Sequence, residues 1–293
     1  LRSGIMSGDI VTDIFDAVPF NPGEPTMFPL DFLAPGTERD FTAYTVPNQG
    51  RIPNKFVEGD YVMIPTFQSA NAIDVNRRYL QFARWDVMSR MLEVLEAGMI
   101  KKRNDDGWHL LLTGGLDRNI VVYDSEASQG QFTKRLVSLM KLIMRRNGGG
   151  NSTSVNRFQL TDLYMSPESQ EDIRNWGLDQ IDEVTRREIY LAPDNSISRV
   201  FGVNLHAIDE LGEDQEYQLF FQNDLGGALQ TSDVELFVGL DLVTTPAFKM
   251  PVVEDISSFP DESAFRSRQV GWVSLAEWGF GLMDNRPVLL GSC

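Results

Sequence analysis

The sequence is poor in the residues that most often carry chemistry. Among its 293 residues the only cysteine is Cys293, and the only histidines are His109 and His206. A single cysteine excludes an intrachain disulfide and a zinc site built from cysteines. No apolar run approaches the roughly 20 residues that a transmembrane helix needs, so we expect no membrane partner.

Positive charge is scarce as well. The chain has 26 Lys and Arg residues against 42 Asp and Glu residues, a formal net charge of -16. Such a charge repels phosphate and argues against a surface that grips nucleic acid, although an acidic surface can still face DNA without adhering to it. The start shows no signal-peptide pattern, and Leu1 in place of methionine indicates that the chain was processed or that residues before it are left out.

Neither histidine is placed for catalysis or for metal binding. His109 and His206 lie in different strand-like contexts, and neither has a neighbouring set of ligands at metal spacing. The sequence contains no G-x-S-x-G elbow, which disfavours a serine triad built on either histidine. We therefore expect both to be structural or surface residues.

The glycine run and the acidic clusters are expected to be loops. Gly148, Gly149 and Gly150 follow a predicted helix and precede no GK[ST], so they indicate a flexible connector instead of a phosphate loop. A calcium ion bound by the acidic clusters stays open, because Ca²⁺ prefers oxygen ligands, although the spacing of these acids does not match the helix-loop-helix calcium pattern. We expect no catalytic, cofactor-binding or metal-ligating residues and no cofactor. The clusters, in turn-like segments, are Glu213, Asp214 and Glu216, and Glu254 and Asp255.

The first forty residues are predicted to form an extended arm. Prolines at positions 19, 22, 25, 29 and 35 forbid a long helix. The segment is too apolar for a solvated tail, so we expect another subunit to cover its large side chains. These side chains are Phe15, Phe20, Met27, Phe28, Leu30, Phe32 and Leu33.

A hairpin and a long helix are predicted next. Strand-like runs at 41–46 and 55–64 flank a turn-rich connection, and a hairpin outside a larger sheet suggests an intermolecular contact. From Asp74, which can cap a first turn, to about Arg103, apolar residues recur at steps of three and four. About 30 residues at 1.5 Å each predict a rod of roughly 45 Å.

The remaining elements mix helices and strands. A helix is predicted over 131–146, a strand and a short helix over 158–177, and strands at 200–208, 217–221 and 234–243. No strand-helix-strand order repeats, so the predicted fold class is α+β. The closing stretch AEWGFGLMDNRPVLLG, residues 276–291, predicts a strand with one apolar face. That face carries Trp278, Phe280 and Leu282, and the other carries Glu277, Gly279 and Gly281.

Taken in order, these elements resemble the major capsid protein of tailed bacteriophages, the Hong Kong 97 fold. The stretch FQLTDLYMSPESQEDIRNW is similar to that family's strand and proline-bearing helix start in the axial domain. The closing stretch is similar to the last strand pair of its peripheral domain. The resemblance, which covers nearly the whole chain, implies that Gly279 and Gly281 let the closing ribbon lie against the spine helix while the apolar face packs on the other side.

The resemblance also implies a division of the chain. An N-terminal arm would span 1–40, an extended loop 41–72, a peripheral domain with a spine helix 73–125, an axial domain 126–265, and C-terminal strands of the peripheral domain 266–293. Removal of an N-terminal scaffolding segment by a maturation protease, as in many members of the family, would fit the start at Leu1.

A structural, non-enzymatic role follows from the same resemblance. Subunits would self-assemble as hexamers and pentamers of an icosahedral virion shell, assembled in the host cytoplasm. The shell would enclose double-stranded DNA without sequence-specific binding. Scaffold, portal and cement proteins would be further partners.

Some members of the family weld their shells with a lysine-asparagine isopeptide bond that a glutamate assists. Lys55 lies in the expected extended loop and Glu277 matches the position of the acid, but Val270 stands where the asparagine is expected. The resemblance therefore implies no covalent weld. Lys55 is expected to be a solvated or salt-bridged residue and Glu277 a strand carboxylate.

Two other functions stay open. A bacterial nanocompartment (encapsulin-type) shell shares this fold but encloses an enzyme cargo, so the contents of purified particles discriminate it from a virus shell. A soluble hydrolase or binding domain would form a particle of a few chains at most, which a size measurement detects.

Overall fold

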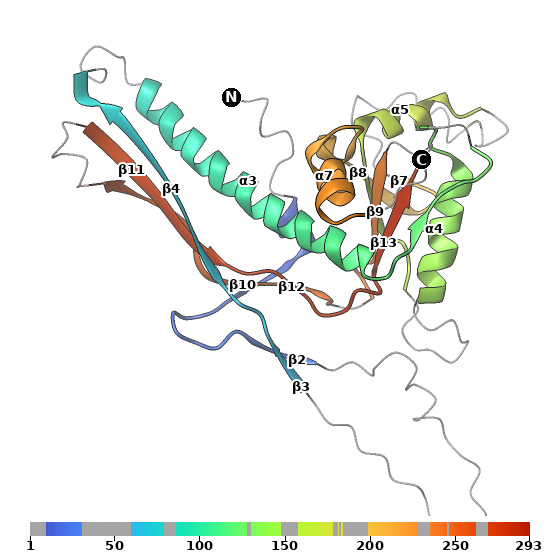
Figure 1. The fold of residues 1–293 in the computed structure, drawn as a ribbon, viewed down its shortest axis with the longest axis horizontal. Helices are drawn as coiled ribbons and strands as arrows, with labels where there is room; N and C mark the ends of the chain where they lie inside the picture. Colours follow the sequence, from blue (N-terminus) through green and yellow to red (C-terminus); the bar gives the residue numbers. More distant parts are fainter. Residues whose placement is uncertain are drawn as a thin grey trace, which may run out of the picture.

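The computed structural model describes residues 10–30, 60–78, 86–127, 130–147, 158–177, 181, 183, 199–227, 235–244, 246–261 and 269–293 (Figure 1). Its helical elements are α1 (Val11–Ile14), α3 (Asp86–Leu116), α4 (Lys134–Asn147), α5 (Pro167–Asn175), the 3-10 turn η3 (Asp209–Leu211), α7 (Glu216–Leu219) and the π-helical η4 (Phe220–Asp224). Its strands are β1 (Asp16–Pro19), β2 (Met27–Leu30), β3 (Asp60–Met63), β4 (Phe67–Asn76), β5 (Val121–Val122), β6 (Asp162–Met165), β7 (Arg199–Val200), β8 (Val203–Ala207), β9 (Leu236–Leu240), β10 (Phe248–Asp261), β11 (Gln269–Trp278), β12 (Gly281–Leu282) and β13 (Val288–Ser292). Helices and mostly antiparallel strands follow one another irregularly, so the predicted α+β class is confirmed.

A six-stranded sheet, in the order β5-β13-β9-β6-β8-β7, separates two apolar cores. Successive residues of a strand point to opposite faces. Phe237 and Leu289 therefore pack in the core that contains α4, whereas Val238 and Leu290 pack with Trp108 of α3. Figure 1 shows this sheet between α4 and the C-terminal end of α3. Burial on both faces explains why its central strands are continuous apolar runs.

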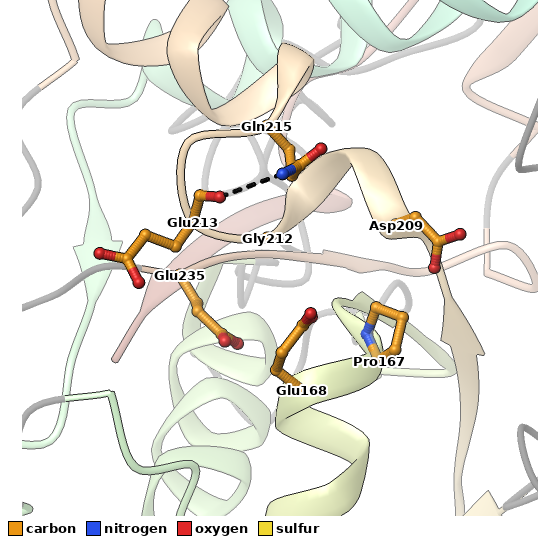
Figure 2. A pocket seen from close by; sticks show the side chains of 7 residues that line it. All are labelled: Pro167, Glu168, Asp209, Gly212, Glu213, Gln215 and Glu235. Carbon is orange, nitrogen blue, oxygen red and sulfur yellow. Dashed lines mark hydrogen bonds between the residues drawn. The ribbon is translucent and has the colours of Figure 1, made fainter. Parts of the chain in front are cut away.

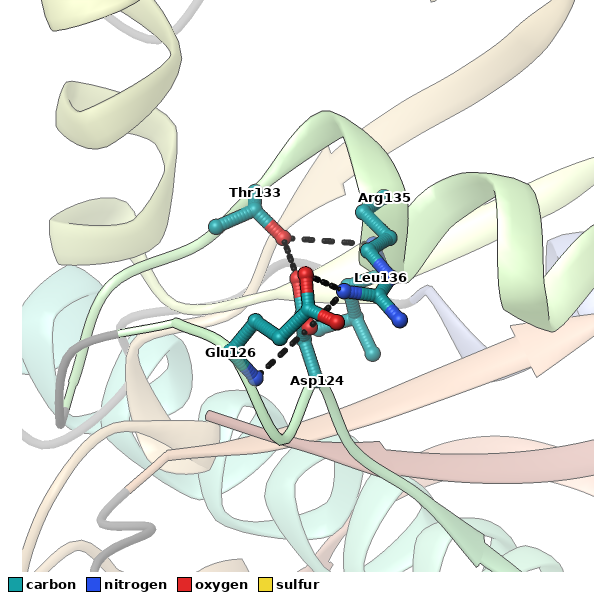
Figure 3. Close-up of polar contacts among 5 residues, drawn as sticks. All are labelled: Asp124, Glu126, Thr133, Arg135 and Leu136. Atoms are coloured by element: carbon teal, nitrogen blue, oxygen red, sulfur yellow. Dashed lines mark hydrogen bonds and ion pairs between the residues drawn. The ribbon is translucent and has the colours of Figure 1, made fainter.

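Polar contacts fix the start of α4 (Figure 3). The Thr133 hydroxyl accepts a hydrogen bond from the Leu136 amide at 3.2 Å and donates one to Asp124 at 2.7 Å. Arg135, in the first turn, forms ion pairs with Asp124 and with Glu126. This cap ties α4 to the preceding loop, and the helix predicted over 131–146 is confirmed.

A second sheet extends away from the first and lies along α3 (Figure 1). Its order is β1-β10-β11-β4, with β12 also paired to β10, and we call it the projecting sheet. Met99 of α3 packs against Ala276 and Trp278 of β11. Helix α3, which has 31 residues, thus contacts both sheets and connects their cores.

The predicted position of the long helix is wrong. The apolar spacing predicts a start at Asp74 and an end near Arg103, but α3 runs from Asp86 to Leu116. Asp74 lies in β4, opposite Gly271 of β11. Exposed and half-buried residues alternate along β4, as expected of a strand. In the sequence, apolar residues at helical spacing follow directly after this segment, so the two patterns are easily taken for one helix.

Two glycines inside α3 are close-packing positions. A Cβ on Gly107 would collide with the side chain of Val11, and a Cβ on Gly114 would collide with that of Leu282. The absence of a side chain at these two positions therefore lets Val11 and Leu282 approach the helix closely.

The expectation that Gly279 and Gly281 face the long helix is also wrong. A Cβ on Gly281 would collide with Ile64, and a Cβ on Gly279 would collide with the backbone of Pro65. Both glycines therefore allow the segment before β4 to approach closely. The apolar face, including Trp278, is the one that packs on α3.

Three of the four later predictions are confirmed. β8 and β9 lie within the runs at 200–208 and 234–243, and β6 and α5 form the strand and helix predicted over 158–177. The strand predicted over 217–221 is wrong, because α7 and η4 are helical there. Tyr217 and Phe221, four residues apart, are both buried in the core with Trp108, and that spacing places them on one helical face.

Part of the predicted arm packs on its own chain. β1 pairs in parallel with β10. Phe15 is 2% exposed, and its ring centroid lies 5.0 Å from that of Phe280 and 5.7 Å from that of Phe248. The expectation that another subunit covers Phe15 is therefore wrong, because the projecting sheet already covers it. Phe32 and Leu33 lie outside the described residues.

Candidate assembly surface

β2 and β3 form a two-stranded ribbon that joins no larger sheet among the described residues. Figure 1 shows this β2–β3 ribbon beyond the end of the projecting sheet. Met27 lies directly opposite Met63, and the two residues are 53% and 62% exposed. Tyr61 is 67% exposed. A two-stranded ribbon alone is only marginally stable in water. Large exposed apolar side chains on such a ribbon indicate that another surface covers them.

The base of the β2–β3 ribbon is anchored to the projecting sheet, where the buried Ile64 side chain lies against Gly281 of β12. The Ile64 amide donates a hydrogen bond to the Thr26 carbonyl at 3.1 Å, and the Thr26 hydroxyl donates one to the Ile64 carbonyl. Phe28 is buried, with its ring centroid 5.6 Å from that of Phe20. The expectation of a partner surface over Phe28 is therefore wrong, whereas Met27 is exposed.

Only one strand of the predicted hairpin lies partly within the described residues, so the pairing of 41–46 with 55–64 stays a prediction. β3 lies within the run at 55–64, but it pairs with β2 from the N-terminal segment. The run at 41–46 lies outside the described residues. A pairing between strands so far apart in the sequence cannot be read from local turn signals.

A second exposed apolar strip lies on the projecting sheet, on the face opposite α3. Ala276 of β11 faces α3, so its neighbour Leu275 faces away, and it lies opposite Ala70 of β4. Phe259, opposite Val273, continues the strip on β10. Leu275 and Phe259 are both exposed.

The two histidines are not brought together and contact different partners. His109 lies in α3 instead of in a strand, and its ring is stacked on Phe220 with centroids 3.8 Å apart. His206 lies in β8, with Nε2 3.0 Å from Asp162 and its ring stacked on Tyr164. Each ring packs on an aromatic neighbour, and neither has a nucleophile placed beside it by a hydrogen bond in the described structure.

Asp162 is the centre of the polar contacts around His206. Burial raises the pKa of its carboxyl group, but hydrogen bonds from His206, Thr161 and Asn204 lower that pKa by more, so it lies below its ordinary value. The ionised carboxylate is therefore stabilised in the fold. This arrangement ties β6 to β8, in which Asp162 and Asn204 are direct partners.

The acidic clusters are separated by the fold. Asp214 lies in a turn with φ of 57°, and Glu216 pairs with Lys101 of α3 at 2.8 Å. Asp255 lies in β10 together with Glu254, so the expectation of a turn there is wrong. Asp255 pairs with Arg103 at 3.3 Å, which ties the projecting sheet to α3.

A pocket of about 360 Å³ lies between α5 and the segment from Asp209 to Gln215 (Figure 2). Glu235 points into this pocket, but no local sequence pattern predicts it, because the acids around it come from distant parts of the chain. Among the described residues no group of three or more His, Cys, Asp or Glu could hold a metal ion. The lining side chains are Pro167, Glu168, Asp209, Gln215, Glu213 and Glu235, with Gly212.

The residues weighed for a covalent weld have separate places. Glu277 accepts a hydrogen bond from the Thr66 hydroxyl at 2.7 Å and one from the Gln68 amide at 3.3 Å, so it acts as a strand carboxylate between β11 and β4. Val270 lies in β11 opposite Val75. Lys55 and the glycine run 148–150 lie outside the described residues.

Solved structures with a similar fold exist for nearly the whole chain. One is from Gordonia phage Cozz, with a TM-score of 0.62 and 9% identity over 97% of this chain and 86% of that chain. A second, from Microbacterium phage Oxtober96, has a TM-score of 0.64 and 10% identity over 98% and 90%. A third is the capsid of an empty GTA particle, with a TM-score of 0.60 and 12% identity over 98% and 90%.

The likeness is one of fold. No protein-family model and no curated protein matches the sequence. The resemblance inferred from the sequence is confirmed for the fold, which this chain shares with phage structures and with a particle capsid. No helix in the described part of the chain is long and apolar enough to cross a membrane.

Proposed function

We propose that this protein is the major capsid protein of a tailed phage or a phage-like particle. Its copies self-assemble as hexamers and pentamers of an icosahedral shell that encloses double-stranded DNA. The role is structural and not enzymatic, and the protein belongs to the virion capsid, assembled in the host cytoplasm. The observation that carries the proposal is the fold, shared over 98% of the chain with the capsid of a GTA particle.

The β2–β3 ribbon supports this proposal. The subunit already buries two apolar cores, so the exposed Met27, Tyr61 and Met63 on the two-stranded ribbon are not required for its own packing. Exposed apolar side chains on an anchored, outlying element suit a contact with a second copy of the chain. Many modest contacts of this kind, repeated around each subunit, stabilise a closed shell.

The net charge of -16 fits a container for nucleic acid that does not bind it. A shell that gripped phosphate would retain its genome through many ionic contacts, whereas an acidic lining lets packed DNA slide. Scaffold, portal and cement proteins are the further partners that such a shell would use.

We also propose a division of the chain into an arm, an extended loop and two domains. We assign 1–40 to the arm, 41–72 to the extended loop, 73–125 and 266–293 to the peripheral domain, and 126–265 to the axial domain. Because β13 pairs with β9 and β5, strands from both proposed domains meet in the six-stranded sheet.

A size measurement with matched variants tests the proposal. Sedimentation velocity of the purified wild type should show large particles, and a Tyr61→Gln, Met63→Gln double variant should remain as small oligomers whose circular dichroism spectrum matches that of the wild type. Leu142→Gln, on the exposed face of α4, is the control and should assemble like the wild type. A wild type that never exceeds a few chains would overturn the proposal, and protein cargo instead of nucleic acid in purified particles would favour a nanocompartment.

A further inference from the structure

Glu235 is a buried carboxyl group at the edge of the pocket in Figure 2. It lies directly before β9 and is 6% exposed. Its amide donates to the carbonyl of Cys293 at 3.1 Å, and the Cys293 amide donates to its carbonyl at 3.3 Å. The ion pairs among the described residues do not include Glu235, so its negative charge has no cationic partner there.

One oxygen of this carboxyl group accepts both serine hydroxyls at the start of α5. Ser166 Oγ lies 2.5 Å from Glu235 Oε2, and Ser169 Oγ also donates to Oε2. Ser166 is the N-cap of α5 and accepts a hydrogen bond from the Ser169 amide at 3.2 Å. A proton added at Oε1 leaves all of these hydrogen bonds in place, because Oε2 remains an acceptor.

Carboxyl groups face Glu235 from the elements packed against it. Cys293, directly after β13, contributes its backbone, and its side chain lies in the apolar core. Ionised Glu235 is therefore repelled from two sides of the pocket, whereas protonated Glu235 is not. The facing groups are Glu168 and Asp172 on α5 and Glu213 on the turn after η3.

We propose that this pocket is a proton-operated latch between α5 and the segment from Asp209 to Gln215. With a proton on Glu235, the carboxyl group is neutral, keeps its hydrogen bonds to Ser166 and Ser169 of the α5 wall, and does not repel the other wall. Ionisation adds a negative charge that repels Glu213, and the segment moves away from α5. The latch concerns the isolated folded subunit, so it does not rest on the proposed function.

The linkage between this proton and stability has a definite sign. Burial raises the pKa of Glu235 to about 7, with a smaller contribution from the facing carboxylates, while the hydrogen bond from Ser166 lowers it. Between the ordinary value of 4.5 and about 7, the folded chain holds a proton that the unfolded chain has lost. The stability from this group is complete below pH 4.5, is lost as the pH rises to about 7, and is constant above that.

Unfolding in urea from pH 5 to 8.5 tests this linkage on the full chain. We compare the wild type with Glu235→Gln, which keeps an acceptor for the two serines and cannot ionise. We expect the ratio of the two folding equilibrium constants, wild type over variant, to fall as the pH rises to 7, by up to about tenfold per pH unit, and to be constant above pH 7. Glu93→Gln, exposed on α3 and outside this pocket, is the control and should keep the wild-type pH dependence.

Hydrogen exchange of the wild type tests the movement without any variant. Amides in the segment from Asp209 to Gln215 should exchange faster at pH 8 than at pH 6, after correction for the intrinsic pH dependence of exchange. Parallel stability profiles of the wild type and Glu235→Gln would overturn the latch. Equal corrected exchange of this segment at the two pH values would overturn it as well.

Discussion

Replacing Phe15 by alanine tests whether the segment that contains α1 and β1 belongs to the fold of its own subunit. The Phe15 ring makes edge contacts with Phe248 of β10 and with Phe280, and it lies in the same core as Trp108 of α3. Truncating a fully buried phenylalanine costs about 3–5 kcal/mol, the lost transfer free energy plus the cavity that remains. We therefore expect Phe15→Ala to lower the free energy of unfolding of unassembled subunits by about that amount.

Urea unfolding at low protein concentration, followed by tryptophan fluorescence, measures this loss without a contribution from assembly. Phe20→Ala is the matched control: Phe20 is only half-buried and packs on Phe28 at the base of the ribbon, so its loss should be clearly smaller. If Phe15→Ala unfolds like the wild type while assembly fails, then Phe15 is covered by another subunit, and the account of the N-terminal segment is refuted.

Three further substitutions follow from local geometry. Thr133→Ala removes the cap of α4 and should cost about 1 kcal/mol in urea unfolding, whereas Ser138→Ala, on the exposed side of the same helix, should cost far less. Gly279→Ala forces a Cβ against the backbone of Pro65 and should lower the free energy of unfolding by about 1–3 kcal/mol in the same assay. Gly212→Ala, where a Cβ meets only ordinary contacts, should have nearly the wild-type stability. Equal stabilities of the two variants would contradict the packing described. Asp162→Asn should lower the melting temperature at pH 7 and should flatten the fall of the melting temperature below pH 4. The lowered pKa of Asp162 contributes stability above the carboxyl pKa of the unfolded chain, and this stability is lost as the pH falls through the pKa of the folded chain. An unchanged acid profile would contradict the role of this carboxylate.

Local patterns predict those elements whose packing agrees with their periodicity. Helix α4 presents Leu136 and Met140 to one core at helical spacing, and the start of α5 carries a serine cap followed by proline. Strands such as β9, buried on both faces, stand out as apolar runs. In these cases propensity, pattern and tertiary contacts agree.

The errors occur where a distant segment decides the local structure. β4 is a strand because β11 pairs with it along its length, and no turn signal links the two. Phe15 is buried because β10 accepts β1 as a parallel neighbour, which an apolar, proline-rich sequence cannot reveal. Glu235 meets Ser166 and Ser169 only in the folded chain, so neither the latch nor its pocket has a sequence signature.

Electron microscopy of the purified protein under assembly conditions tests the central claim most directly. The account predicts closed particles whose averaged images show rings of five and six subunits, with the β2–β3 ribbon of each subunit lying on a neighbour. A uniform population of small, compact particles of one or a few chains, with the ribbon exposed to solvent, would contradict it.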